Sequence, residues 1–93
     1  MNIMAVKIAS GEEIVAEVIE QLDGSIQCRR PRVVQMMQTQ QGVGAGLVPY
    51  IMSAPDATIP INPDCIVAKV KVGSQIERAY TQEVSGLDLT TKF

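Results

Sequence analysis

Residues 8–26, IASGEEIVAEVIEQLDGSI, decide the fold class that the chain is expected to adopt. Gly11 supplies the positive φ that a tight turn requires, and Asp23-Gly24 is typical of a hairpin between apolar runs. Glu and Ala favour a helix between these turns, whereas the β-branched pairs Ile14-Val15 and Val18-Ile19 favour a strand. Because a turn bounds the run on each side, we predict a strand over residues 13–22 within a tightly wound antiparallel meander.

Similar patterns on either side of this stretch predict the remaining strands. Ile and Val dominate residues 2–9, and extended runs follow over residues 26–37, 47–53, 58–61 and 65–72. Pro31 interrupts the first of these later runs, which implies a bulge, a bend or an edge position there. The chain is therefore expected to be mainly β.

Two further expectations concern the second half of the chain. The polar, glycine-rich segment 38–46 is expected to form a mobile loop. In the strand over residues 65–72, the alternation of side chains places one apolar set inward, namely Ile66, Ala68, Val70 and Val72. The same alternation places Lys69 and Lys71 outward.

One helix is expected, over residues 74–86. Ser74 and Glu77 have the spacing of a capping box, in which each side chain satisfies a free backbone donor of the other. Ile76, Tyr80 and Val84 follow at four-residue intervals, and Gly86 is expected to end the helix. The helix is long enough to lie across the open end of a small barrel built from residues 1–72, with 87–93 as a tail. At 93 residues, the chain is expected to form a single domain.

Composition points to self-association. Apolar residues make up 46% of the chain and aromatic residues only 3%. A chain of this length buries roughly 60 to 65% of its unfolded surface, so this aliphatic content exceeds what one small core uses. Contact with further copies of the chain is the simplest way to bury the excess.

The charge balance argues against a protein that grips nucleic acid mainly by long-range attraction. The net charge is −2 and the pI is about 4.9, whereas such proteins are usually basic. A local basic patch remains open, because Arg29, Arg30 and Arg32 lie within four residues.

No catalytic or metal-binding pattern is found. The chain has no histidine, which excludes Ser-His and Cys-His nucleophiles. Glu13 and Glu17 would lie about 13 Å apart on a strand, at ~3.3 Å per residue, beyond the roughly 5 to 9.5 Å of a glycosidase pair. Cys28 and Cys65 are isolated, so both are expected to be small buried hydrophobes. We therefore expect neither enzyme activity nor a cofactor nor a metal.

Targeting signals are also not evident. Residues 1–7 do not show the basic and apolar regions of a signal peptide, and the uncharged stretch 42–54 is shorter than the about 20 residues of a membrane span. A cytoplasmic location without membrane association is expected.

Five positions follow the first motif of the Sm-like family: Ile8, Gly11, Ile14, Ala16 and Val18. Ala16 stands where that motif usually has a second glycine. Gln27 falls where the family tends to have Asn, and Ile61-Asn62-Pro63-Asp64-Cys65-Ile66 resembles its second motif, with Asn62 and Pro63 in place of Arg and Gly. Over roughly residues 3–72 the chain thus resembles Sm-like proteins, and it is most similar to uncharacterised ones encoded by phages.

The resemblance implies a strongly bent, antiparallel, five-stranded open barrel that assembles into a ring of roughly five to seven copies. In such a ring the fourth strand of one subunit pairs with the fifth strand of the next, and an open barrel does leave two edges to be paired. The residues expected at this interface are Leu47, Val48, Tyr50, Ile51, Met52, Ile66, Ala68 and Val70.

Two functions are compatible with such a ring. The first is an assembly or adaptor module whose partner is another protein, for which Met36, Met37 and Met52 would provide adaptable contacts. If the chain is phage-encoded, this role would be played in the host cytoplasm. The alternative is a ring that binds single-stranded RNA. In that case Gln27 and Asn62 would contact base edges and Tyr50 would stack on a base, with the phosphates bound by Arg29, Arg30, Arg32, Lys69 and Lys71.

Overall fold

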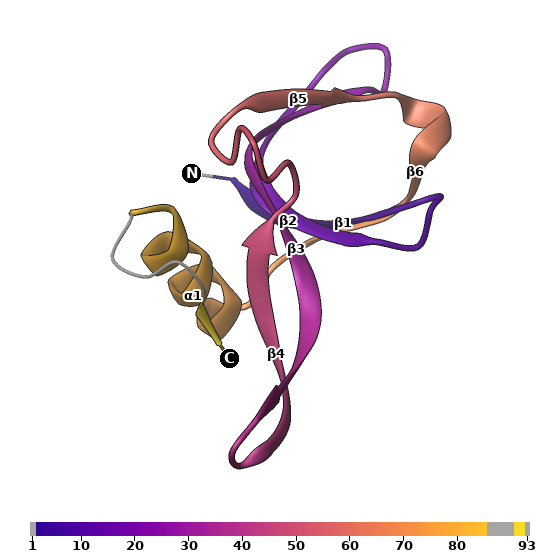
Figure 1. Ribbon diagram of the computed structural model, residues 1–93. Coiled ribbons are helices and arrows are strands. Elements are labelled where there is room, and N and C mark those ends of the chain that lie inside the picture. Colours follow the sequence, from indigo (N-terminus) through magenta and orange to yellow (C-terminus); the bar gives the residue numbers. More distant parts are fainter. Residues whose placement is uncertain (1, 86–90, 93) are drawn as a thin grey trace.

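The computed structural model describes residues 2–85, 91 and 92, which form one antiparallel sheet with a short helix near the C-terminus (Figure 1). The strands are β1 (Ile3–Ile8), β2 (Glu13–Glu20), β3 (Ile26–Thr39), β4 (Gly42–Pro49), β5 (Thr58–Ile61), β6 (Ile66–Lys71) and β7 (Thr91–Lys92). A 3₁₀ turn, η1 (Pro63–Cys65), joins β5 to β6, and the helix is α1 (Ser74–Val84). The sheet order is β6-β1-β2-β3-β4-β7, with β5 also paired to β3. The expectation of a mainly β chain with one C-terminal helix is confirmed.

The long strand β3 organises the sheet, because its two halves have different partners. Residues Ile26 to Arg29 pair with β5, and residues Arg32 to Thr39 pair with β4. Between them Arg30 has a φ of +51°, and the register with β2 shifts at the same place. The irregularity predicted from Pro31 is therefore confirmed. It lets the sheet curl, so that β5, η1, β6 and β1 surround a common interior (Figure 1).

Two apolar cores lie on opposite faces of this curled sheet. The first core fills the interior with residues from the first three strands and β5: Val6, Ile8, Ile14, Ala16, Val18, Ile26, Cys28 and Ile61. The second core lies under α1 and contains Ile3, Val15, Leu47, Ala79 and Tyr80. Neighbouring residues of β2 thus serve different cores, as a strand requires. The strand predicted from the β-branched pairs is correct.

Both tight turns at the ends of β2 form as predicted. Gly11 and Gly24 have φ values of +100° and +88°, which other residues rarely adopt. In the second turn the Asp23 carboxylate accepts hydrogen bonds from the Ser25 hydroxyl (2.6 Å) and the Ser25 amide (2.9 Å). These bonds lower the pKa of Asp23 and fix the path of the chain into β3.

The prediction of a loop over residues 38–46 is wrong. β3 and β4 continue as a two-stranded arm that turns only after Thr39, and in Figure 1 the arm projects away from the curled sheet. Gly42 turns the chain with a φ of +119°, while Gly44 and Gly46 are extended and paired with β3. Cross-strand pairing thus overrides the weak strand preference of glycine.

The prediction of a strand over residues 47–53 is also wrong at its C-terminal end. β4 ends at Pro49, and two turns follow, in which the Ala54 and Ala57 amides bond the carbonyls of Ile51 and Ala54. The chain regains extended structure at β5, where it was predicted.

The alternation expected for β6 is only partly correct. Ile66 and Val72 are half-buried and contact the first and the second core, and Lys69 and Lys71 are exposed as expected, but Ala68 and Val70 are exposed as well. The cause is a register shift opposite Lys7 and Ile8, which breaks the alternation after Ile66.

The capping box expected for the helix does not form. Gly73 is the N-cap, and Ser74 is the first helical residue, so its hydroxyl caps no backbone donor. The apolar stripe is confirmed, since Ile76, Tyr80 and Val84 all contact the second core. Helix α1 ends at Val84, and the stop predicted at Gly86 lies outside the described residues, as do 87–90 and 93 of the tail.

Candidate functional site

The outer edges of β5 and β6 are open where the sheet curls. Within residues 2–85, 91 and 92, β5 pairs only with β3 and β6 pairs only with β1, and no backbone pairing joins β5 to β6. Unpaired strand edges are templates for a further strand, and proteins usually protect them. These two margins are therefore the first candidates for an assembly site.

The outer edge of β6 presents backbone donors and acceptors. The Val72 amide bonds the Ile3 carbonyl (3.3 Å), so Val70 and Ala68 continue the hydrogen-bonded pairs with β1. The amides and carbonyls of Lys69 and Lys71 then point outward. Beside them, Val67 and Val70 are 68% and 64% exposed. This edge thus combines two donors, two acceptors and an apolar surface.

The outer edge of β5 is complementary in its backbone groups. The Arg30 amide bonds the Ala57 carbonyl (3.3 Å), so Ile59 and Ile61 face β3, while Thr58 and Pro60 face outward. Pro60 has no amide hydrogen, which leaves two carbonyl acceptors and one donor. An edge rich in acceptors therefore stands at one margin of the sheet and an edge with two donors at the other.

The residues expected at a subunit interface are distributed unevenly. Leu47 is fully buried in the second core, which removes its side chain from any contact with a neighbour. Val48, Tyr50 and Ile66 are half-buried, and Ile51, Met52, Ala68 and Val70 are exposed. β4 is flanked by β3 and, at Gly46 and Leu47, by β7. The outer edge of β4 is thus covered at Gly46 and Leu47, whereas the outer edge of β5 has no strand beside it among the described residues.

The turn between β2 and β3 and the 3₁₀ turn η1 lie side by side at one end of the curled sheet. A Cβ atom added to Gly24 would lie 3.5 Å from the Pro63 side chain, so the Asp23-Gly24 turn lies against η1. Beside η1 is a hollow of about 420 Å³, lined mainly by apolar groups of β1, β5 and the turns that follow them. Its lining is Ile8, Ala9, Ser10, Tyr50, Pro60, Ile61, Asn62 and Cys65.

This hollow brings together only some of the residues expected to bind RNA. Tyr50 and Asn62 line it. Gln27 is half-buried on β3 opposite Pro60, and Lys69 and Lys71 lie on β6. Two of the cations are engaged on the surface: Lys69 pairs with Glu20 (2.8 Å) and Arg29 with Glu17 (3.4 Å). Such exposed pairs stabilise by about 1 kcal/mol at most and do not prevent contact with a phosphate.

Arg32 does not lie on the surface where the sequence placed it. Its side chain is only 4% exposed, and its Nε donates to Oε2 of Glu83 (3.1 Å). Its other nitrogens donate to the Pro55 carbonyl (2.6 Å) and to Asp56 (3.2 Å). Because its donors bond other groups of the same chain, Arg32 is a structural residue.

Tyr80 completes the attachment of α1 to the sheet. Its hydroxyl accepts from the Glu17 amide (3.2 Å) and lies within donating distance of the Arg29 and Arg30 carbonyls (2.9 and 3.1 Å). These backbone groups lie where the register between β2 and β3 shifts. Burial raises the pKa of the Tyr80 phenol. We refer to Arg32, Tyr80 and Glu83 as the helix-docking cluster, which sequence periodicity alone did not reveal.

The two cysteines differ in environment. Cys28 lies in the first core, and burial raises the pKa of its thiol to about 11. Cys65 is exposed at the hollow, so the expectation that it is buried is wrong. Its place at the end of η1, outside the regular strand, explains the difference. Burial also raises the pKa of Tyr50, with a smaller effect from Glu12.

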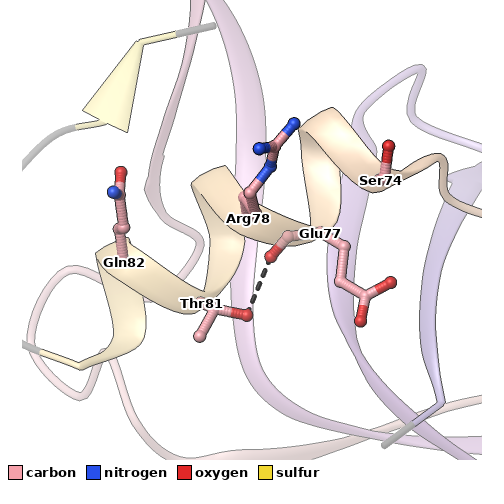
Figure 2. A pocket seen from close by; sticks show the side chains of 5 residues that line it. All are labelled: Ser74, Glu77, Arg78, Thr81 and Gln82. Atoms are coloured by element: carbon pink, nitrogen blue, oxygen red, sulfur yellow. Dashed lines mark hydrogen bonds between the residues drawn. The ribbon is translucent and has the colours of Figure 1, made fainter.

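A second hollow of about 370 Å³ lies on the outer side of α1 (Figure 2). It is lined by Ser74, Glu77, Arg78, Thr81 and Gln82, and the Thr81 hydroxyl bonds the Glu77 carbonyl (2.8 Å). These side chains follow one helix, and they include none of the residues expected to bind a partner. Over the part of the chain that the structure describes, no three His, Cys, Asp or Glu side chains form a metal-binding group, and no helix is long and apolar enough to cross a membrane.

No model of a known protein family matches the chain, and no curated protein matches it in sequence.

Proposed function

We propose that the chain is a non-enzymatic assembly module of the Sm-like type, in which β5 of one copy pairs with β6 of the next copy around a ring. The main support for this proposal is that the open edges of β5 and β6 have complementary backbone groups. Thr58 and Pro60 offer carbonyl acceptors at one margin, and Lys69 and Lys71 offer outward amide donors at the other.

Two further observations support this proposal. The connectivity of five antiparallel strands, with a 3₁₀ turn before the last one, is similar to that of an Sm-like subunit when β4 and β5 are taken as one interrupted strand. A head-to-tail contact between two different edges also closes into a ring when the rotation permits it. In this proposal the partner of the ring is another protein.

The proposal is tested by replacing one outward amide. Lys71→Pro removes a donor from the outer edge of β6, but it leaves the bonds of Ala68 and Val70 to β1 in place. Lys71→Ala is the matched control, since it removes the charge and keeps the amide. Light scattering should show a multiple of the 10.0 kDa chain for the wild type and for Lys71→Ala, and a smaller particle for Lys71→Pro. A wild-type protein of 10.0 kDa would contradict the ring.

Single-stranded RNA binding is the second candidate, because Tyr50 and Asn62 line the same hollow. An aromatic ring that stacks on a base contributes about 1 to 3 kcal/mol, and an amide beside it could contact the base edge. The buried Arg32 leaves fewer cations for phosphates than the sequence suggested.

Fluorescence anisotropy with labelled oligo-U and oligo-A at two salt concentrations distinguishes the two candidates. RNA binding predicts affinity that falls steeply with salt and is weakened by Asn62→Ala and by Arg29→Glu. Arg78→Glu on α1 makes the same charge change at a distance and should leave binding unchanged. If neither oligonucleotide binds at micromolar protein, the RNA candidate is excluded and the protein-assembly role is retained.

A further inference from the structure

The arm formed by β3 and β4 carries an exposed strand edge without any charge. Residues 33–55 contain no Asp, Glu, Lys, Arg or His, although ionisable residues are frequent on both sides. At the free end of the arm, Met36 and Val43 are 66% and 68% exposed. Proteins normally protect such edges with charges, prolines or bulges. Residues 35–45 have no such protection.

The backbone of β3 in the arm has its outer edge open. The Tyr50 amide bonds the Pro31 carbonyl (3.1 Å), so Gln35 and Met37 use their backbone groups toward β4. The amides and carbonyls of Met36 and Gln38 therefore point away from β4. The register with β2 ends at Val33. Among the residues that the structure describes, no strand covers the edge from Met36 onward.

The two faces of the arm have different characters. Met36, Ala45 and Val43 continue the face on which Val34 and Leu47 contact the second core. The opposite face pairs Gln35 and Met37 with Gly46 and Gly44, which have no side chains. The arm is thus neutral, and it presents apolar groups where α1 no longer covers it.

From these observations we infer that the β3 edges of two copies pair antiparallel about a two-fold axis, so that the arms join two rings. This inference rests on the proposed ring. Residues 33–39 contain the strand-forming residues Val33, Val34 and Thr39 and no charge, proline or glycine, which is a composition that favours strand-to-strand association.

A second copy is the occupant that the edge fits best. The arm has no charge with which to recognise a nucleic acid or an anionic surface, and a neutral edge meets its own copy without repulsion. In an antiparallel pair, Met36 of one copy lies opposite Gln38 of the other. The amide and carbonyl of Met36 then bond the carbonyl and amide of Gln38 in the other copy, and the two-fold axis repeats these bonds. The open edges of β5 and β6 are less suitable, because Pro60 interrupts β5 and two lysines lie on β6.

One arm contact is too small to hold two subunits alone, since stable interfaces bury about 1,000 Å² or more. A ring presents several arms together, and simultaneous contacts reinforce one another. The wild-type particle is therefore expected to have twice the mass of a single ring.

Native mass spectrometry of the full chain tests the inference with two matched variants. Met36→Lys places like charges near the two-fold axis and should halve the mass of the particle. Val43→Lys adds the same charge to the same face of the arm, but on β4, and should leave the mass unchanged. If Met36→Lys retains the wild-type mass, or if Val43→Lys halves it as well, the β3 contact is wrong.

A cross-link provides a measurement that does not depend on the effect of an added charge. In a Cys65→Ser background, Met37→Cys should form a disulfide between copies, because residue 37 lies opposite itself across the axis. Gln35→Cys is the control. In the same register, residue 35 of one copy lies four residues along the strand from residue 35 of the other copy, which is about 13 Å and too far for a disulfide. Absence of the Met37→Cys cross-link would count against the pairing.

The same measurements separate this inference from the ring. A wild-type dimer that Met36→Lys converts to monomer, and that Lys71→Pro leaves intact, would disprove the ring and support the arm contact. A ring of single mass that responds only to Lys71→Pro would support the ring and disprove the arm contact.

Discussion

Arg32 on β3 and Glu83 on α1 form a buried ion pair, with 3.1 Å between Nε and Oε2 and with side chains only 4% and 3% exposed. The pair joins the helix to the strand at the place where β3 changes partners. Oε1 of Glu83 has no hydrogen-bond partner among the described residues. Removing either ion would leave the other buried without its main counter-charge.

We therefore expect Glu83→Ala to destabilise the fold by about 3 to 5 kcal/mol, the usual effect of removing one member of a buried pair. The double variant Arg32→Met/Glu83→Leu should recover most of this loss, because apolar side chains of similar volume need no counter-charge. Urea unfolding followed by circular dichroism measures both. If the double variant is as unstable as Glu83→Ala, the loss comes from packing and not from the unpaired charge.

The Tyr80 hydroxyl is expected to stabilise the junction between α1 and the sheet. Tyr80→Phe leaves the Glu17 amide without its acceptor, which should cost about 1 to 3 kcal/mol in the free energy of unfolding. Tyr50→Phe is the control, since Tyr50 lies at the rim of the hollow, and its stability should change little. Equal effects of the two substitutions would show that the Tyr80 hydroxyl has no special role.

Cys28 should make stability depend on pH in the alkaline range. Its pKa is raised from 9.0 to about 11 in the folded chain, so the folded state holds the proton more tightly than the unfolded state. This contribution is present in full below pH 9.0 and is lost as the pH rises toward about 11. The urea midpoint of Cys28→Val should decline less over this range than that of the wild type. Cys65→Ser should decline as the wild type does.

The two thiols should also differ in reactivity. A thiol reagent added to the folded protein near neutral pH should modify the exposed Cys65 and leave Cys28 unmodified until urea unfolds the chain. Mass spectrometry of the intact protein counts the adducts. Two adducts formed at the same rate under native conditions would show that the first core is open to solvent.

Glycine is required at one position of the arm and not at another. Gly42→Ala should destabilise by about 1 kcal/mol or more, since residue 42 has a φ of +119°. Gly44→Ala should be neutral or stabilising, because residue 44 is an extended strand position and a Cβ there has nothing within 4 Å. Thermal unfolding of the two variants compares them directly. Equal losses would indicate that the segment is the flexible loop expected from composition.

Local signals in the sequence predicted the first half of the fold well. Gly11, Asp23-Gly24 and Pro31 act through the backbone angles that they permit or forbid, and these constraints hold in any tertiary context. The β-branched pairs of β2 were equally reliable, because Ile14, Val15 and Val18 are all buried. The resemblance to Sm-like proteins, the ring and RNA binding stay predictions.

Contacts between distant residues decided the rest. The glycines and glutamines of the arm gave no local strand signal. The strands form there because β3 pairs with β4, from Gln35 opposite Gly46 to Thr39 opposite Gly42. The exposure of Val70 depends on a register shift against β1 that its own neighbours do not reveal. The sequence predicts Arg32 to be a surface cation beside Arg29 and Arg30, but Glu83 of the distant helix α1 pairs with it in the interior.

The sequence by itself determined where the chain turns and which runs extend, because φ preferences and side-chain alternation depend only on neighbouring residues. Tertiary structure alone decided which strand edges stay open and which charges are buried. Both properties depend on how segments far apart in the chain pair and pack, and the free energy of that pairing is not contained in any one segment.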